Sequence, residues 1–100
     1  MTGYDLDGVI TTGKYHPSFT DVIITANYID KFAHVMKVMK EFNVACPVYF
    51  NPYKQYGRQW SSEWKAEIIN KLGVSVFYED NEEEAMIIKA SCPNTTIIKV

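Results

Sequence analysis

Short runs of β-branched and aromatic residues alternate along this chain with stretches whose apolar residues recur at helical spacing. Runs of the first kind predict strands at residues 1–5, 21–25, 46–50, 74–78 and 95–100. Strands that alternate with helices form a mostly parallel sheet with helices on its faces. The expected fold is therefore an α/β, doubly wound, Rossmann-like three-layer sandwich with a mostly parallel five-stranded sheet.

The first predicted helix lies between the second and third strands. Apolar residues recur at helical spacing over residues 29–42, and Asn27 stands before them as the expected N-cap. Residues 8–20, between the first two strands, contain Gly13, Pro17 and several hydroxyl residues. This composition predicts a turn or hairpin there rather than a helix.

Two further helices are expected in the second half of the chain. Ser61 or Ser62 is placed to cap a helix that Gly73 ends, since glycine commonly follows the last helical turn. Asn81, with Glu84 three residues later, has the pattern of a capping box that opens a helix to about residue 90. Acidic residues in its first turn suit the positive end of the helix dipole.

Length and charge exclude several classes of protein. One hundred residues predict a single domain over 1–100, and the formal charge of −2 gives no overall attraction to nucleic acid or anionic membrane. No apolar run has the length of a membrane span, and the first eight residues do not have the pattern of a signal peptide. We therefore expect a cytoplasmic protein without membrane association, with Cys46 and Cys92 as buried, reduced thiols.

Polar and charged residues gather where the predicted parallel strands end. The carboxyl ends of such strands share one rim, and ligands of open α/β sheets bind there. Carboxylates brought together at this rim repel one another unless a divalent cation lies among them, and oxygen ligands without His or Cys favour Mg²⁺. The side chains expected at this rim are Asp5, Asp7, Thr25, Lys65, Glu79 and Asp80.

The segment Asp5-Leu6-Asp7-Gly8-Val9 resembles the DxDG(T/V) signature of the haloacid dehalogenase (HAD) superfamily of aspartate-nucleophile phosphohydrolases. It is followed in the family's order by a strand ending in Thr25, by Lys65 on a helix, and by a strand ending in Glu79-Asp80. The resemblance covers essentially the whole chain. It implies a HAD-like core and a Mg²⁺-dependent phosphatase that forms an aspartyl-phosphate.

The resemblance also implies catalytic roles. Asp5 is expected to attack phosphorus as the nucleophile, and Asp7 to protonate the leaving oxygen and then activate water. The Thr25 hydroxyl and the backbone N–H of Ala26 are expected to bind a phosphoryl oxygen. Lys65 is expected to neutralise the charge that nucleophile and phosphate share.

The metal ligands follow from the same resemblance. Asp5 and Asp80 are expected to hold Mg²⁺, with Glu79 binding directly or through water. Asp7 is expected to contribute its backbone carbonyl.

The chain leaves little room for the cap domain that HAD proteins usually insert, so the expected core has no cap. Capless members act on large substrates that cover the site, or they form homo-oligomers. The loop at residues 53–60 combines aromatic and basic residues, and Tyr56 and Arg58, with Lys14 and Tyr15, are expected to bind a nucleotide or a nucleic-acid end. The alternative is a loop whose aromatic residues pack back on the domain.

Two other functions remain open. A receiver-like signalling domain also combines acidic pairs, Thr and Lys, but it places its phospho-acceptor Asp after the third strand, where this chain has Asn51. A non-catalytic module that binds Mg²⁺ or phosphate is the other alternative. His16 and His34 are assigned no role, and the acidic residues 82–84 are interpreted as a solvated start of a helix.

Overall fold

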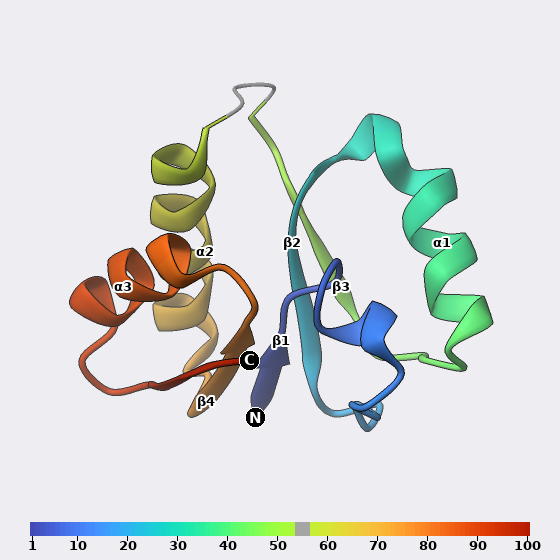
Figure 1. The fold of residues 1–100 in the computed structure, drawn as a ribbon, viewed down its shortest axis with the longest axis horizontal. Coiled ribbons are helices and arrows are strands. Elements are labelled where there is room, and N and C mark those ends of the chain that lie inside the picture. The colour runs from blue at the N-terminus through green and yellow to red at the C-terminus, as the bar shows by residue number, and fades with distance from the viewer. Residues whose placement is uncertain (54–56) are drawn as a thin grey trace.

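The computed structural model describes residues 1–53 and 57–100 of the chain. Within these residues, five parallel strands form one sheet in the order β3-β2-β1-β4-β5 (Figure 1). This is the order of the first five strands of a Rossmann-like doubly wound sheet, with β1 at the centre. The strands are β1 (Thr2–Tyr4), β2 (Val22–Tyr28), β3 (Val48–Asn51), β4 (Val76–Glu79) and β5 (Thr96–Lys99).

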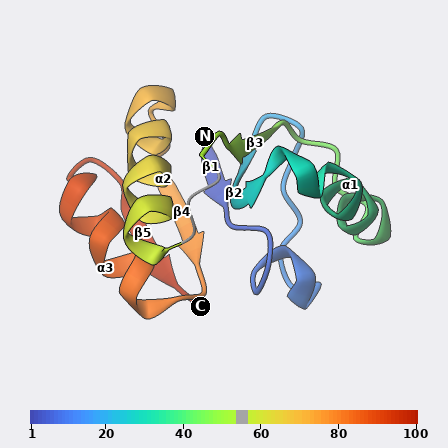
Figure 2. The ribbon, with the colours of Figure 1, turned by 90° about the horizontal axis from the view of Figure 1, so that it is seen from above.

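Helices cover both faces of the sheet. Helix α1 (Phe32–Glu41) lies on one face, and α2 (Arg58–Leu72) and α3 (Glu82–Ser91) lie together on the other (Figures 1 and 2). Two single turns of 3-10 helix, η1 (Ile10–Thr12) and η2 (Ile29–Lys31), complete the regular structure of the described residues. The predicted α/β class, the five-stranded parallel sheet and the three helices are thereby confirmed.

The hydrophobic core is divided by the sheet into two halves. Side chains alternate between the faces of a strand, so Ile23 of β2 packs on the α1 side whereas Val22 and Ile24 pack on the other. Val35 of α1 is completely buried in the first half, and Ile69 of α2 in the second. The sheet is thus held from both sides, which fixes the position of its carboxyl rim.

The segment between β1 and β2 contains η1 and no strand, so the turn alternative is right and the hairpin alternative is wrong. The Leu6 carbonyl accepts the N–H of Ile10 at 2.9 Å, so local turns bind the backbone instead of a second strand. Farther along, the Tyr15 ring lies 4.8 Å from that of Tyr78, which stacks on Tyr4 at 5.1 Å. The segment therefore covers β1 and β4 where α1 does not reach.

Two predicted helix starts are wrong. Asn27 lies within β2, which continues to Tyr28, and α1 begins only at Phe32 after η2. Helix α2 begins at Arg58, before Ser61 and Ser62, and these serines lie inside the helix. A cap at Ser61 or Ser62 would place Lys65 in the first turn, but Lys65 lies in the middle of α2.

The other predicted helix boundaries are confirmed. Gly73 ends α2 with a left-handed φ of 69°. The side chain of Asn81 caps α3 by accepting the N–H of Glu84 at 3.0 Å.

Both cysteines lie in the core as reduced thiols. Cys46 and Cys92 are both free and buried, as the sequence predicts. Burial raises the pKa of the Cys46 thiol to about 11. In the described residues, no helix combines the length and the apolar character that crossing a bilayer requires.

Candidate active site

Three carboxylates from two strand ends meet at the rim of the sheet. Asp5 follows β1, Glu79 is the last residue of β4, and Asp80 follows it. Because β1 and β4 are parallel neighbours, these residues reach the same edge. Each offers a carboxylate oxygen, and the three oxygens lie within 4.8 Å of one another.

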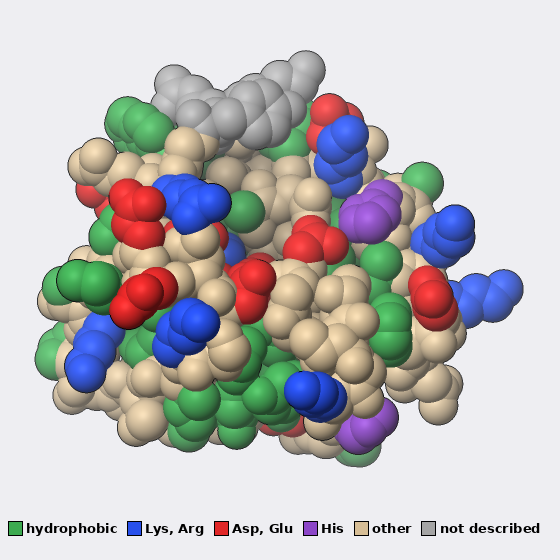
Figure 3. All heavy atoms as spheres, in the orientation of Figure 1, with side chains coloured by type: hydrophobic (Ala, Val, Ile, Leu, Met, Phe, Trp, Pro, Cys, Tyr) green, Lys and Arg blue, Asp and Glu red, His purple; other side chains and the backbone are tan. Residues whose placement is uncertain are grey.

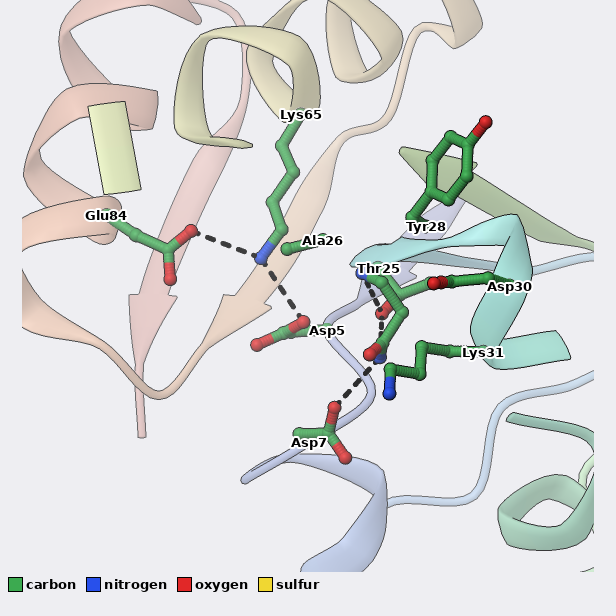
Figure 4. A pocket seen from close by; sticks show the side chains of 10 residues that line it. Asp5, Asp7, Thr25, Ala26, Tyr28, Asp30, Lys31, Lys65 and Glu84 are labelled. Carbon is green, nitrogen blue, oxygen red and sulfur yellow. Dashed lines mark hydrogen bonds and ion pairs between the residues drawn. The ribbon is translucent and has the colours of Figure 1, made fainter. Parts of the chain in front are cut away.

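The ammonium of Lys65 enters this group from α2. Its Nζ donates to Glu79 Oε1 at 2.9 Å. It also donates to Asp5 Oδ1 at 3.2 Å and lies 3.5 Å from Glu84 Oε1 (Figure 4). Lys65 is only 1% exposed. Burial alone lowers its pKa, but the carboxylates of Asp5, Glu79 and Glu84 outweigh burial and raise the pKa, so the side chain stays charged.

Asp5 and Glu79 are buried carboxylates fixed by several donors. The Asp5 Oδ1 also accepts the N–H of Leu6 at 2.9 Å, and Glu79 Oε2 accepts the N–H groups of Asp80 and Asn81 at 3.1 and 3.3 Å. Burial raises the pKa of both carboxyl groups, and Lys65 opposes the rise. Glu79 thus uses both of its oxygens inside the protein.

Glu84 is a residue of the site that the sequence interpretation missed. Its Oε1 accepts the hydroxyls of Ser61 and Ser62 at 2.9 and 3.3 Å and faces Lys65, so it is not a solvated residue at the start of a helix. Ser61 and Ser62 gave a hint of this contact. They lie one helical turn before Lys65, and buried hydroxyl groups inside a helix require a polar partner.

Asp7 points to the other side of the rim. Its Oδ2 accepts the side-chain N–H of Asn27 at 3.0 Å, and its Oδ1 lies 3.4 Å from His34 Nε2. Its side chain is 57% exposed. The Asp7 carboxylate therefore lies outside the group formed by Asp5, Glu79 and Asp80.

Thr25 lies beside Asp7 at an irregular position of β2. It pairs with Phe50, whereas the next paired residue, Tyr28, faces Asn51, so Ala26 and Asn27 form a bulge without partners in β3. The buried Thr25 Oγ1 accepts both the backbone and the side-chain N–H of Asn27, at 3.2 and 2.8 Å. Asn27, expected as a helix cap, and His34, to which no role was assigned, are thus contacts of the site that the sequence did not indicate.

A pocket of about 270 Å³ opens between the side of the rim that carries Asp5 and Lys65 and the side that carries Asp7 and Thr25. Figure 4 shows Lys65 reaching from α2 to Asp5, with Asp7 and Thr25 on the opposite wall. Figure 3 shows acidic side chains around the middle of this face of the molecule. The lining residues are Asp5, Asp7, Thr25, Ala26, Asn27, Tyr28, Asp30, Lys31, Lys65 and Glu84.

Gly8 has a steric reason to follow Asp7. Its φ is +82°, a left-handed conformation that glycine adopts without strain. A Cβ at this position would lie 2.0 Å from Asp80 Oδ2. The absence of a side chain therefore lets Asp80 approach the loop that carries Asp5 and Asp7.

The described residues that were expected to contact substrate outside the rim do not line the pocket. Tyr56 lies outside the described residues. Arg58 is exposed at the first position of α2 and does not line the pocket. Tyr15 packs against Tyr4 and Tyr78, while Lys14 is exposed.

The donor set fits a divalent cation. Asp5, Glu79 and Glu84 surround one ammonium, which leaves an excess of negative charge at the rim. The Asp80 carboxylate adds to it and makes no hydrogen bond or ion pair with any other described residue. Mg²⁺ is commonly held in proteins by one or two carboxylates together with substrate phosphate. Asp5 and Asp80 meet that requirement.

Comparisons with protein-family models, with curated proteins and with solved structures found no match.

Proposed function

We propose that this protein is a Mg²⁺-dependent phosphohydrolase, similar to capless HAD enzymes, that cleaves phosphate monoesters through an aspartyl-phosphate on Asp5. One observation carries the proposal: the Asp5 carboxylate is fixed by Lys65, adjoins Asp80, and borders a pocket that Thr25 and Asp7 also line. Phosphoryl transfer requires an aligned nucleophile and neutralisation of phosphate charge, and this arrangement supplies both.

Asp5 acts as the nucleophile. Its Oδ1 is fixed by Lys65 and by the N–H of Leu6, which sets the plane of the carboxylate before substrate arrives. A carboxylate oxygen attacks phosphorus, the bond to the leaving oxygen breaks, and an aspartyl-phosphate results. Such preorganisation lowers the cost of alignment in the transition state.

Asp5 and Asp80 would hold Mg²⁺, with the backbone carbonyl of Asp7 as a further ligand. When bound, the ion supplies positive charge against the phosphoryl oxygens. Glu79 serves the site through Lys65, because its two oxygens already bind the ammonium and two backbone N–H groups. Glu84 holds the same ammonium from α3.

Thr25, Ala26 and Lys65 bind the phosphoryl group. All three line the pocket, and Lys65 carries a full positive charge there. The bulge leaves Ala26 without a partner in β3, which suits its backbone N–H to an external acceptor. These donors stabilise the charge that builds on phosphorus-bound oxygens.

Asp7 transfers the protons. It borders the pocket and is largely exposed, so it can exchange protons with water between steps. It donates a proton to the leaving oxygen, and afterwards accepts one from the water that attacks the aspartyl-phosphate. That attack releases phosphate and restores the Asp5 carboxylate.

The substrate extends beyond the pocket. A volume of about 270 Å³ accommodates a phosphoryl group with a small part of its ester. The exposed Arg58 is expected to contact the remainder of a nucleotide or nucleic-acid end, as is Tyr56, which lies outside the described residues, and a second copy of the chain is the alternative cover. The proposal therefore favours substrates larger than the pocket.

The test is hydrolysis of p-nitrophenyl phosphate with Mg²⁺, with EDTA, and by Asp5→Asn. We expect steady release of phosphate that both EDTA and the substitution abolish. One stable phosphorylation per chain would instead indicate a receiver-like domain. Binding of Mg²⁺ without turnover or labelling would indicate the non-catalytic module. A screen of nucleotides and 3′- or 5′-phosphorylated oligonucleotides then identifies the substrate class.

A further inference from the structure

Asn27 contacts two of the groups that the proposed reaction uses. Its side-chain Nδ2 donates to Thr25 Oγ1 at 2.8 Å and to Asp7 Oδ2 at 3.0 Å. An amide nitrogen has two hydrogens, and each is used by one of these contacts. The planar amide of Asn27 thus links the Thr25 hydroxyl, proposed to bind phosphate, to the Asp7 carboxylate, proposed to act as acid and base.

The amide of Asn27 sets the direction of these hydrogen bonds. Its nitrogen only donates, so Asp7 Oδ2 and Thr25 Oγ1 both accept from it. The same NH₂ group then faces Thr25 Oγ1, which also accepts the backbone N–H of Asn27. With both acceptor positions of the oxygen filled, the Thr25 hydrogen is left to donate toward another acceptor, and the pocket adjoins it.

The bulge in β2 makes this geometry available. Ala26 and Asn27 have no partner in β3, so the chain between Thr25 and Tyr28 is released from the ladder. The side chain of Asn27 can therefore turn back over Thr25 and reach Asp7, which lies in the loop after β1. A regular strand would turn residue 27 to the same face as Thr25 at a greater distance.

We propose that Asn27 is a positioning residue that sets the proton direction of Thr25 and the orientation of Asp7 together. This inference rests on the proposed phosphohydrolase function. Asn27 is predicted to matter most when the leaving oxygen requires a proton from Asp7, and less when the leaving group departs without one.

The test compares two esters in the presence of Mg²⁺: an alkyl phosphate, whose leaving oxygen needs protonation, and p-nitrophenyl phosphate, whose leaving group does not. The variant Asn27→Asp keeps the size of the side chain but replaces the donating NH₂ by an acceptor that repels Asp7. We expect its kcat/KM to fall at least about tenfold more for the alkyl ester than for the aryl ester, since general acid catalysis contributes about 10²–10⁴-fold.

Two further variants distinguish loss of the positioning role from a folding defect. Asn27→Ala removes the donor without adding charge and is expected to change the ratio of the two kcat/KM values in the same direction. Asn94→Asp places the same substitution at an exposed position away from the pocket and is expected to leave both values unchanged. Thermal unfolding of each variant shows whether a loss reflects unfolded protein.

The outcomes separate this inference from the function on which it rests. Equal losses for both esters in folded Asn27→Asp and Asn27→Ala would overturn the positioning role and leave the phosphohydrolase intact. A wild-type protein that hydrolyses neither ester would overturn the function, and the role of Asn27 with it. A selective loss for the alkyl ester supports both.

Discussion

Asp5 and Asp7 stand two residues apart and lie in opposite environments. The Asp5 side chain is 10% exposed and is bound to a lysine that is itself buried, whereas the Asp7 side chain is 57% exposed and is bound by Asn27 and His34. Asp5 contacts Lys65 of α2, whereas Asp7 contacts Asn27 of β2 and His34 of α1. One short loop therefore supplies a buried and an exposed carboxylate to the same pocket.

This difference separates two chemical requirements. A nucleophile gains from a fixed position near compensating charge. The buried half of the site, around Asp5, provides both through Lys65. A group that donates and accepts protons must exchange them with water, and the exposed half provides that access. The comparison predicts that substitutions in the buried half affect both folding and activity, while those in the exposed half affect activity alone.

The largest effect is expected for Asp5→Asn. The amide cannot form the aspartyl-phosphate, so kcat for p-nitrophenyl phosphate should fall by about 10⁴-fold or more, as for other nucleophile substitutions. The measurement is phosphate release with Mg²⁺, and circular dichroism confirms that the variant is folded. Retention of more than about a tenth of the activity would remove Asp5 from the nucleophile role.

Lys65→Met tests the buried half through stability. Removing the ammonium leaves the buried carboxylates of Asp5 and Glu79 beside the partly buried Glu84, and breaking a buried ion pair in this way costs about 3–5 kcal/mol. Urea unfolding without Mg²⁺ measures the loss. Lys71→Met on the same helix is exposed and should change the free energy of unfolding by less than about 0.5 kcal/mol. Equal losses in the two variants would show that the charge cluster does not stabilise the fold.

Gly8→Ala tests the contact between the two halves. The added Cβ would meet the Asp80 carboxylate and would also strain a left-handed backbone, so we expect a loss of about 2–3 kcal/mol and weaker Mg²⁺ binding by calorimetry. Gly13→Ala is the matched control, because its φ is +75° and its Cβ would lie in ordinary contact with Phe42, at 3.6 Å. It should lose about 1 kcal/mol from the backbone alone and keep its Mg²⁺ affinity. Identical behaviour of the two variants would contradict the role of Gly8.

The smallest effect on stability is expected for Asp7→Asn. Its contacts are solvent-exposed, and such contacts contribute about 0–1 kcal/mol, so the free energy of unfolding should change by less than about 0.5 kcal/mol. The same variant should lose about 10²-fold or more in kcat/KM for an alkyl phosphate. A stability loss as large as that of Lys65→Met would abolish the distinction between the two halves.

The sequence predicted those parts of the site that depend on strand ends. Asp5, Glu79 and Asp80 meet because parallel strands present their carboxyl ends at one edge, and the order of the elements was readable from hydrophobic periodicity. Lys65 was also placed at this rim, although it lies deeper in its helix than expected. Roles in catalysis remain predictions for the experiments above.

Residues that act through tertiary contacts were not predicted. Asn27 and the serines at positions 61 and 62 have the local pattern of helix caps, but their side chains bind Asp7, Thr25 and Glu84 instead. Local propensity cannot register such partners, because they come from distant parts of the chain.

The central place of β1 has a consequence for how the protein is made. Gly3 pairs with Val22 on one side and with Phe77 on the other, so β1 receives its second neighbour only after the long segment between Val22 and Phe77 has been synthesised. Such long-range pairing is slow relative to local helix formation. The carboxylate cluster depends on this pairing, and a chain interrupted before β4 lacks two of its three carboxylates.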